Sequence, residues 1–282
     1  AVAAATDAQA ELIFDPFPRL YDPNDRQVVV LDPDNKDFTI LREILNSFPP
    51  VAEMASVSSA QQLQDRLNEA NRFAYPLLAW LISSNRSHIV LLPPEQRLQI
   101  KTPFQYLMLS SAPEKEAVFQ ELKVKHGSKF AWHGSPTQNW HSISRRGLVS
   151  ASGTKLQRHG SAHGSGIYLS TTLSYSMGYS TKNSRFTGRG TRVAATTADA
   201  DEYEARFLDP ENMICVALCE LIDTSEVRKS NNIWVVPNAD HVAVRFLFVF
   251  SHAKSIEYEK RNSTDSSFHA EVCDILAAQM SG

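Results

Sequence analysis

The chain has 282 residues, of which 43% are hydrophobic and 21% are charged, and its formal net charge is −3 at pH 7. This composition excludes a fibrous or wholly disordered protein. The slight negative charge argues against attraction of the whole surface to nucleic acid or to an anionic membrane. The length allows one or two domains, and we expect two.

The cysteine content and the hydropathy restrict where the protein works. Three cysteines are too few for a disulfide framework, so we expect a cytoplasmic or nuclear protein. No run approaches the roughly 18 apolar residues that a membrane span requires, and we expect no membrane partner. Because the chain starts at Ala1 without a methionine and stops at Gly282, we also expect it to be part of a longer protein.

Two regions are predicted before residue 128. Residues 1–36 contain several X-Pro steps around one β-like run at 28–31, which indicates a loop-rich N-terminal arm. Residues 37–127 show the apolar spacing of helices, and we expect a small helical domain there. Its helices are predicted from Asp37 to the Pro49-Pro50 stop, over 60–71, over 76–82 and over 114–125, before Gly127.

The apolar period changes toward two after residue 128. Strands are predicted over 130–133, 166–170, 214–221, 233–236 and 242–250, with a short helix over 140–146 and a closing helix over 269–280. The polar stretch 181–209 has no clear period, and we interpret it as a long excursion between two core strands. The region 128–282 is therefore expected to be a mixed α+β domain.

Two short sequence segments, 132–135 and 166–170, carry the strongest chemical signal. Taken alone, His133 beside a glycine is more typical of a strand end with a backbone hydrogen bond than of a ligand contact. The interpretation changes when the wider set is included. An imidazole can bind a ribose hydroxyl, a glycine backbone can bind an amide, and two tyrosines can stack on an aromatic ring. The set comprises His133, Gly134, Ser135, Gly160, Gly164, Gly166, Tyr168, Ser176 and Tyr179.

These segments resemble the poly(ADP-ribose) polymerase superfamily, which has the diphtheria-toxin-like ADP-ribosyltransferase fold. The similarity is closest to its mono-ADP-ribosylating branch and covers roughly residues 40–282. It rests on the following segments: 75–78, 83–86, 109–111, 130–135, 139–143, 146–148, 154–157, 159–160, 164–170 and 233–238. It implies two packed antiparallel sheets in a catalytic domain at 128–282, preceded by the helical domain.

The resemblance also implies a role for each residue of the set, with NAD as the co-substrate. His133 would bind the adenosine-side ribose, the Gly134 backbone would hold the nicotinamide amide, and Ser135 would lie along the ribose. Tyr168 and Tyr179 would enclose the nicotinamide ring, and Ser176 would donate to its carboxamide. Residues 151–166, including Gly160, would form the loop over the adenine and the pyrophosphate.

The third catalytic position departs from the polymerases. Counted back from Arg245-Phe246, the place of the polymerases' glutamate falls on Ile233, which has no ionisable group. The resemblance therefore implies a His133, Tyr168 and Ile233 triad and transfer of a single ADP-ribose. Three carboxylates are candidates to replace the missing glutamate, but their positions favour solvated or structural roles for all of them: Glu202, Glu204 and Glu220.

Other residues are given structural roles. Cys215 and Cys219 share one face of a predicted strand, but their spacing is wrong for a zinc pair and no histidine completes a site, so we expect core thiols and no metal. The tryptophans at 80, 132, 140 and 234 are expected in the core.

The acceptor is left open between a protein carboxylate and a phosphate at a nucleic-acid end. An anionic acceptor needs no general base, and a basic group at 182–192 would suit a phosphate, although such cations are more often only solvated. The alternative function is a catalytically inactive NAD- or ADP-ribose-binding module that serves as a scaffold or targeting domain. Related fungal proteins suggest a further fused domain, for example a ubiquitin-conjugating one.

Overall fold

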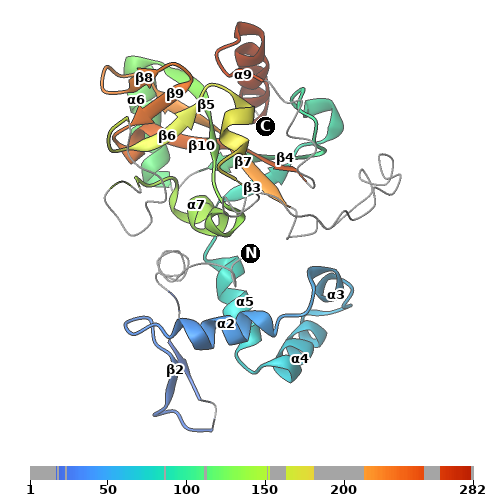
Figure 1. Cartoon of the computed structure of the whole chain (residues 1–282). Coiled ribbons are helices and arrows are strands. Elements are labelled where there is room, and N and C mark those ends of the chain that lie inside the picture. Colours follow the sequence, from blue (N-terminus) through green and yellow to red (C-terminus); the bar gives the residue numbers. More distant parts are fainter. Residues whose placement is uncertain are drawn as a thin grey trace, which may run out of the picture. The chain divides into compact units, whose positions relative to one another are not determined.

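The structure is a computed structural model that describes residues 17, 19–22, 24–85, 87–110, 113–150, 152, 163–180, 213–250 and 261–280. The chain forms two compact units, Ala1–Arg86 and Ser87–Gly282. Figure 1 shows the first unit in blue and cyan and the second in colours from cyan to red. Each unit is described separately below.

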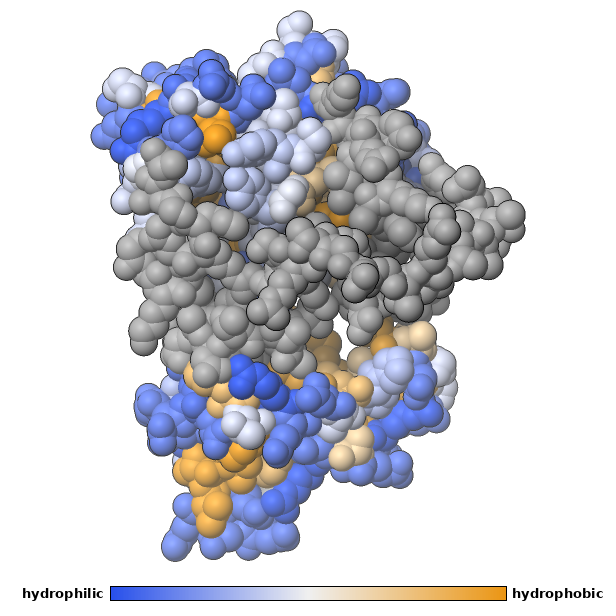
Figure 2. Space-filling model, in the orientation of Figure 1, coloured by the Kyte–Doolittle hydropathy of each residue, from blue (hydrophilic) through white to orange (hydrophobic). Residues whose placement is uncertain are grey.

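The first unit is mainly helical. Its elements are β1 (Leu20–Tyr21), β2 (Val29–Leu31), α2 (Phe38–Asn46), α3 (Val51–Ala55), α4 (Ala60–Ala70) and α5 (Ala74–Ser83). The Asp37 carboxylate caps α2 by accepting from the N–H groups of Thr39 and Ile40, as expected for an aspartate before an amphipathic run. Apolar atoms gather on the surface near β2, where Val28 and Val29 are exposed (Figure 2).

The second unit is built on an eight-stranded sheet in which every neighbouring pair is antiparallel. The strand order is β3-β4-β10-β7-β5-β6-β9-β8. In chain order the strands are β3 (His88–Leu91), β4 (Phe104–Ser110), β5 (Ser128–Gly134), β6 (Ile167–Ser170), β7 (Ile214–Ile222), β8 (Arg228–Ser230), β9 (Ile233–Val236) and β10 (Val242–Phe250). The strand predicted over 242–250 is a central strand of the sheet, since β10 pairs with both β4 and β7.

Helices and 3₁₀ turns connect and cover these strands. They are η2 (Pro94–Gln96), α6 (Pro113–His126), η3 (Thr137–Asn139), α7 (Trp140–Arg146), α8 (Leu173–Met177), η5 (Ala239–His241) and α9 (Ser266–Met280). Gly127, the predicted helix stop, follows α6 with a φ angle of +74°, and Gly147 follows α7 with a φ angle of +83°, both in the range that glycine adopts most readily. None of the helices described is long and apolar enough to cross a membrane.

The α+β fold class is confirmed, and the sheet has the form of two halves. β5 and β6 share a single register pair, Trp132 with Ser170, so only this pair joins β3-β4-β10-β7-β5 to β6-β9-β8. Leu169 of β6 and Trp234 of β9 nevertheless lie in the same buried cluster as Ala217 of β7. The two halves therefore pack over one core. The resemblance implied two packed sheets, and the two halves of this continuous sheet correspond to them.

The division between the units differs from the expected boundary between residues 127 and 128. The structure divides at 86/87, because β3 and β4 pair into the large sheet rather than joining a helical domain. Leu107 of β4 is buried opposite Phe246 of β10, and α6 packs on the same unit through Phe119. Residues 87–127 thus belong to the unit that carries the expected catalytic residues.

A buried charge cluster fixes α6 on the sheet, and we define it as Arg245, Glu220, Glu116 and Lys123. Arg245 lies at a bulge of β10, where its guanidinium donates to Glu220 at 2.8 Å and to Glu116 at 2.9 Å. Lys123 of α6 lies 2.7 Å from the other Glu220 oxygen. Glu220, weighed from the sequence as a replacement for the missing glutamate, is therefore structural, as expected. Glu202 and Glu204 lie outside the described residues.

The two cysteines of β7 are core thiols, as predicted. Cys215 and Cys219 are free and buried, and burial raises the pKa of the Cys215 thiol to about 12. Of the four tryptophans, those at 132, 140 and 234 are fully or nearly buried, whereas Trp80 packs half-buried against the core of the first unit. Among the residues that the structure describes, no group of three or more His, Cys, Asp or Glu side chains could hold a metal ion.

Candidate functional site

The site forms where β5 and β6 separate. After the Trp132–Ser170 pair the two strands share no further register, and the His133 side chain spans the opening. Its Nδ1 lies 2.9 Å from the backbone oxygen of Tyr168. The two segments separated by 35 residues in the sequence are thus brought together, as predicted.

The protonation of His133 follows from this contact. A carbonyl oxygen can only accept, so Nδ1 carries the proton and Nε2 carries a free lone pair in the neutral ring. Burial lowers the pKa of the imidazole below its ordinary value, which keeps the ring neutral at physiological pH. The ring also packs edge-on to Trp140, with centroids 6.3 Å apart. His133 is therefore held as a hydrogen-bond acceptor, the role that a ribose hydroxyl requires.

Gly134 is required at its position by close packing. A Cβ atom at this residue would lie 1.7 Å from the backbone oxygen of Ser176, so any side chain would displace α8. This contact brings the end of β5 against the helix that carries the Ser176 hydroxyl. Gly134 stays half-buried, and the backbone approach that an amide contact needs is available here.

The two serines of the predicted set are buried and already hydrogen-bonded. The Ser176 hydroxyl donates to the backbone oxygen of Trp132 at 3.0 Å. Its proton is therefore used within the protein, whereas the expected role was donation to a carboxamide; the hydroxyl oxygen can still accept a hydrogen bond. The Ser135 hydroxyl accepts from the Asn139 amide at 2.9 Å, and its backbone oxygen accepts from the Trp140 indole at 2.9 Å. The proton of the Ser135 hydroxyl can still be donated.

Tyr168 is fixed at its hydroxyl as well as at its backbone. The hydroxyl donates to the backbone oxygen of Gly164 at 2.7 Å and accepts from the His163 N–H at 3.1 Å. Both partners belong to the turn 163–166, which directly precedes β6. The half-buried ring of Tyr168 can therefore present one orientation to a ligand.

Tyr179 follows α8 and pairs with Tyr175 of that helix. Its hydroxyl donates to the Tyr175 hydroxyl at 3.1 Å, and the two ring centroids are 5.5 Å apart. The hydrogen bond that Tyr179 donates to Tyr175, partial burial and the neighbouring Tyr175 and Tyr168 raise the pKa of Tyr179 to about 12. The ring is about two-fifths exposed, so it can form an outer wall of the site.

Ile233 lies on β9, one pair of residues along the strand from the partner of Tyr168, and on the same face of the sheet. Val235 pairs with Tyr168 and Ile233 pairs with Ser170, and side chains two residues apart on a strand share a face. On its other side Ile233 pairs with Ser230 of β8. The row at this position therefore consists of two serines and an isoleucine, and it offers no carboxylate on the face of Tyr168.

Some of the predicted residues lie outside the described part of the chain, and some residues around the site were not predicted. Gly160 and the basic group at 182–192 lie outside the described residues. Sequence reasoning missed Tyr175, although its spacing of four residues before Tyr179 could have indicated a helical pair. It also missed the turn residue His163 and Arg228 of β8, for which the sequence gives no pattern.

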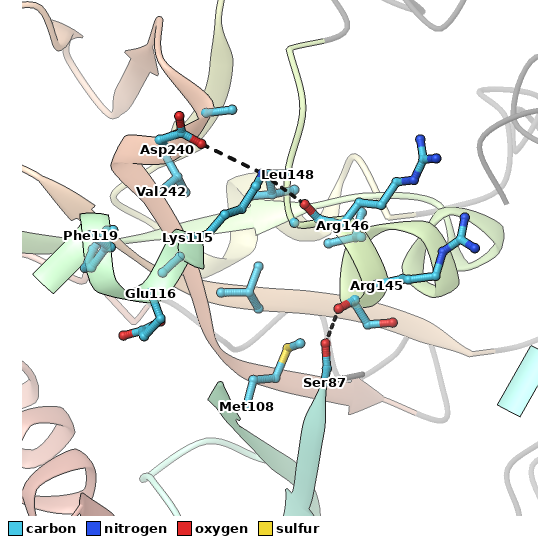
Figure 3. Close-up of a pocket in the computed structure, with 16 residues that line it drawn as sticks. Ser87, Met108, Lys115, Glu116, Phe119, Arg145, Arg146, Leu148, Asp240 and Val242 are labelled. Atoms are coloured by element: carbon cyan, nitrogen blue, oxygen red, sulfur yellow. Dashed lines mark hydrogen bonds and ion pairs between the residues drawn. The ribbon is translucent and has the colours of Figure 1, made fainter. Parts of the chain in front are cut away.

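A separate surface pocket lies between α6, α7 and η5 and contains no predicted site residue (Figure 3). Lys115 lies at its rim, where it donates to the backbone oxygen of Arg146 at 3.3 Å and lies 3.8 Å from Asp240. Met108 and Leu148 contribute apolar surface. The contacts of Lys115 therefore link α6 to α7 and to η5, and no residue that lines this pocket belongs to the predicted set around His133.

The chain is similar to known proteins over the range that holds the candidate site. Residues 109–224 match the family described as the poly(ADP-ribose) polymerase catalytic domain, a range that includes His133, Tyr168 and Tyr179. The chain is 39% identical over 277 residues to the protein mono-ADP-ribosyltransferase PARP8 of Homo sapiens and, to the same extent, to that of Mus musculus. Each alignment covers 95% of this chain and 32% of the relative, so the chain spans about a third of the length of these relatives.

Proposed function

We propose that this chain is a member of the mono-ADP-ribosyltransferase branch of the poly(ADP-ribose) polymerase superfamily, and that it cleaves NAD and transfers a single ADP-ribose to an anionic acceptor. The observation that carries the proposal is the His133–Tyr168 contact, in which a neutral imidazole is fixed on the backbone of an aromatic residue. This contact uses Nδ1 and leaves the Nε2 atom of the neutral ring with a lone pair that can accept a ribose hydroxyl.

The described residues divide the binding of NAD between them. His133 would accept a ribose hydroxyl at Nε2, and the end of β5 at Gly134 would bind the carboxamide through its backbone. The Ser176 hydroxyl oxygen would accept from the amide N–H. Tyr168 and Tyr179 would enclose the nicotinamide ring, since both rings are fixed through their hydroxyls.

The transfer step balances without a general base. The bond between the nicotinamide nitrogen and C1′ breaks, and its electron pair neutralises the positively charged pyridine ring. An acceptor oxygen then forms a bond to C1′, which has developed oxocarbenium character. The protein contributes orientation and fixed dipoles around the separating groups. A carboxylate or phosphate is already an anion and loses no proton, so it suits a site in which Ile233 replaces a carboxylate.

Transfer of a single unit follows from the same replacement. Ile233 lies between Ser170 and Ser230, and none of these side chains can act as an ionised anchor for a ribose hydroxyl. A second ADP-ribose would need such an anchor to be oriented as the acceptor. The acceptor is therefore a protein carboxylate or a terminal phosphate of nucleic acid, and the product carries one ADP-ribose.

The experiment incubates the protein with labelled NAD and separately offers acceptor protein, 5′-phosphorylated RNA and 3′-phosphorylated DNA. We expect discrete products that carry one labelled unit, and we expect His133→Ala and Tyr168→Ala to abolish them. High-mass ladders from the wild-type protein would contradict single-unit transfer. Ile233→Glu then tests the position directly, because restored elongation would show that the missing carboxylate limits the product.

The second candidate function is an inactive NAD- or ADP-ribose-binding module that acts as a scaffold or targeting domain. The absence of a carboxylate at Ile233 is the observation that favours it. The two functions give different results in the same experiment. Binding of NAD without label on any acceptor would support the module and contradict the enzyme.

A further inference from the structure

Arg228 begins the edge strand β8, and its side chain contacts the turn that holds Tyr168. Its guanidinium donates to the backbone oxygen of Ser165. It also lies flat against Gly164, because a Cβ atom there would be only 3.0 Å from the Arg228 Cζ atom. Arg228 is exposed to solvent and 60 residues away from Tyr168 in the sequence, so no local signal predicts this contact.

The sheet register explains how the contact forms. Val235 of β9 pairs with Tyr168 on one side and with Arg228 on the other. The three side chains therefore lie in one row on one face, and Arg228 is two strands, roughly 10 Å, away from Tyr168. The turn fills the space above Val235, since a Cβ atom at Gly166 would lie 2.8 Å from its side chain.

The turn depends on partners for its conformation. Gly164 and Gly166 have φ angles of +90° and +150°, and glycine loses the most conformational freedom on ordering. Besides the contact with Arg228, the Gly166 N–H donates to the Ser152 hydroxyl at 3.2 Å. The turn in turn supplies both partners of the Tyr168 hydroxyl, the Gly164 oxygen and the His163 N–H.

We infer that Arg228 is a positioning residue for NAD, acting through the 163–166 turn on the ring of Tyr168. This inference rests on the proposed function, because it assumes that Tyr168 contacts the nicotinamide. A charge-assisted bond to a backbone oxygen is stronger than a neutral one and restricts the turn to the conformation that binds the hydroxyl. Without it, the ring of Tyr168 has to be ordered when NAD binds, and affinity falls.

The neighbouring residue Lys229 provides a matched control. It lies on the same edge strand, forms an ion pair with Asp223 and lies 5.3 Å from the centroid of the Trp234 ring. Both its partners lie outside the 163–166 turn. Lys229→Gln therefore removes one positive charge from β8 without loosening Tyr168.

The experiment measures the dissociation constant of NAD by calorimetry for Arg228→Gln, Arg228→Lys, Tyr168→Phe and the Arg228→Gln/Tyr168→Phe double variant. We expect about a tenfold loss of affinity for Arg228→Gln, the size of one charged hydrogen bond. Arg228→Lys should recover part of it, and Lys229→Gln should bind like the wild type. The double variant should bind no more weakly than the weaker single variant, because both changes interrupt one path.

The outcomes separate the two proposals. Additive losses in the double variant, or equal losses in Arg228→Gln and Lys229→Gln, would show that Arg228 acts through charge alone and overturn the inference. Wild-type affinity in Arg228→Gln would overturn it too, while the proposed function stands. Failure of the wild-type protein to bind NAD would overturn the proposed function, and the inference with it. Thermal unfolding of each variant confirms that the losses do not reflect unfolding.

Discussion

His133 and Glu220 lie on the adjacent strands β5 and β7, but their surroundings differ in kind. Glu220 has a counter-ion on two sides, Arg245 at 2.8 Å and Lys123 at 2.7 Å, and accepts a further bond from Ser128 at 2.6 Å. Among the described residues, His133 has one hydrogen-bond partner, the backbone oxygen of Tyr168, and its neutral ring carries no charge. The first group has no capacity left for a ligand, and the second keeps a lone pair for one.

Within one sheet, the charged group around Glu220 contributes to stability, whereas the neutral group around His133 is available for binding. In the buried charge cluster, opposite charges compensate for burial, and the cluster fixes α6 against β7 and β10. In the site, neutral groups are oriented by backbone atoms: the Tyr168 oxygen for His133 and the Trp132 oxygen for Ser176. Neutral oriented groups suit a co-substrate that brings its own charges. We therefore expect changes in the cluster to affect unfolding and changes in the site to affect NAD binding.

The largest effect is expected for Glu220→Ala. Removal of this carboxylate leaves Arg245 buried with only Glu116 to compensate its charge, and such a change costs about 3–5 kcal/mol of stability. Urea unfolding followed by circular dichroism should show this loss. NAD affinity of the folded fraction should stay close to that of the wild-type protein. A loss below about 1 kcal/mol would show that the cluster is not a major stabilising element.

His133→Ala tests the other side of the comparison. The variant loses the acceptor for the ribose hydroxyl and the bond to the Tyr168 oxygen, so NAD affinity should fall about tenfold or more. The free energy of unfolding should change less than in Glu220→Ala, since no charge is left uncompensated. Calorimetric titration with NAD measures the first quantity and urea unfolding the second. Unchanged NAD affinity would contradict the assignment of His133.

Local patterns predicted much of the fold. Amphipathic spacing and caps located α2 and α4, and β-branched runs located β7 and β10. β8 has only exposed polar side chains and therefore no apolar alternation to reveal it. The membership of β4 in the large sheet depends on its pairing with β10, well over a hundred residues later in the chain. Pairing over this separation cannot be read from local spacing, which is why the boundary was expected too late.

The sequence predicted which residues form the site, but it could not predict their hydrogen-bond partners. The motifs identified His133 and Tyr168 correctly as neighbours. The donation of Ser176 to the Trp132 oxygen depends on how closely Gly134 lets α8 approach β5, a distance set by the folded sheet. The contact of Arg228 depends on a register shared by three strands. Tertiary packing decides such partners.

Tyr175→Phe probes a smaller contribution to the site. The substitution removes the hydroxyl that accepts from Tyr179, so the pKa of Tyr179 should fall from about 12 toward the ordinary value of 10.0. The ring of Tyr179 would be less well fixed, and NAD affinity should fall about threefold, the size of one neutral hydrogen bond. Ultraviolet titration measures the pKa and calorimetry the affinity. Tyr106→Phe on β4 is the matched control and should leave both unchanged.

The smallest expected effect is the response of NAD binding to mild acid. Burial lowers the pKa of His133 below 6.5, so most of the folded protein keeps the neutral ring as the pH falls from 7.5 to 6.5, and NAD affinity should change less than about twofold. Stability behaves differently. The unfolded histidine takes up a proton near pH 6.5, so the contribution of His133 to stability is full above this pH and declines as the pH falls toward the lower folded pKa.

The buried charge cluster responds at lower pH. Arg245 lowers the pKa values of Glu220 and Glu116 below 4.5, so their stabilisation is full above pH 4.5 and is lost as the pH falls through the folded values. Calorimetric titrations with NAD at several pH values, beside unfolding at the same pH values, separate the two regions. An affinity that falls with a midpoint near pH 6.5 would mean that His133 takes up a proton in the folded state, and the contrast between a neutral site and a charged cluster would fail.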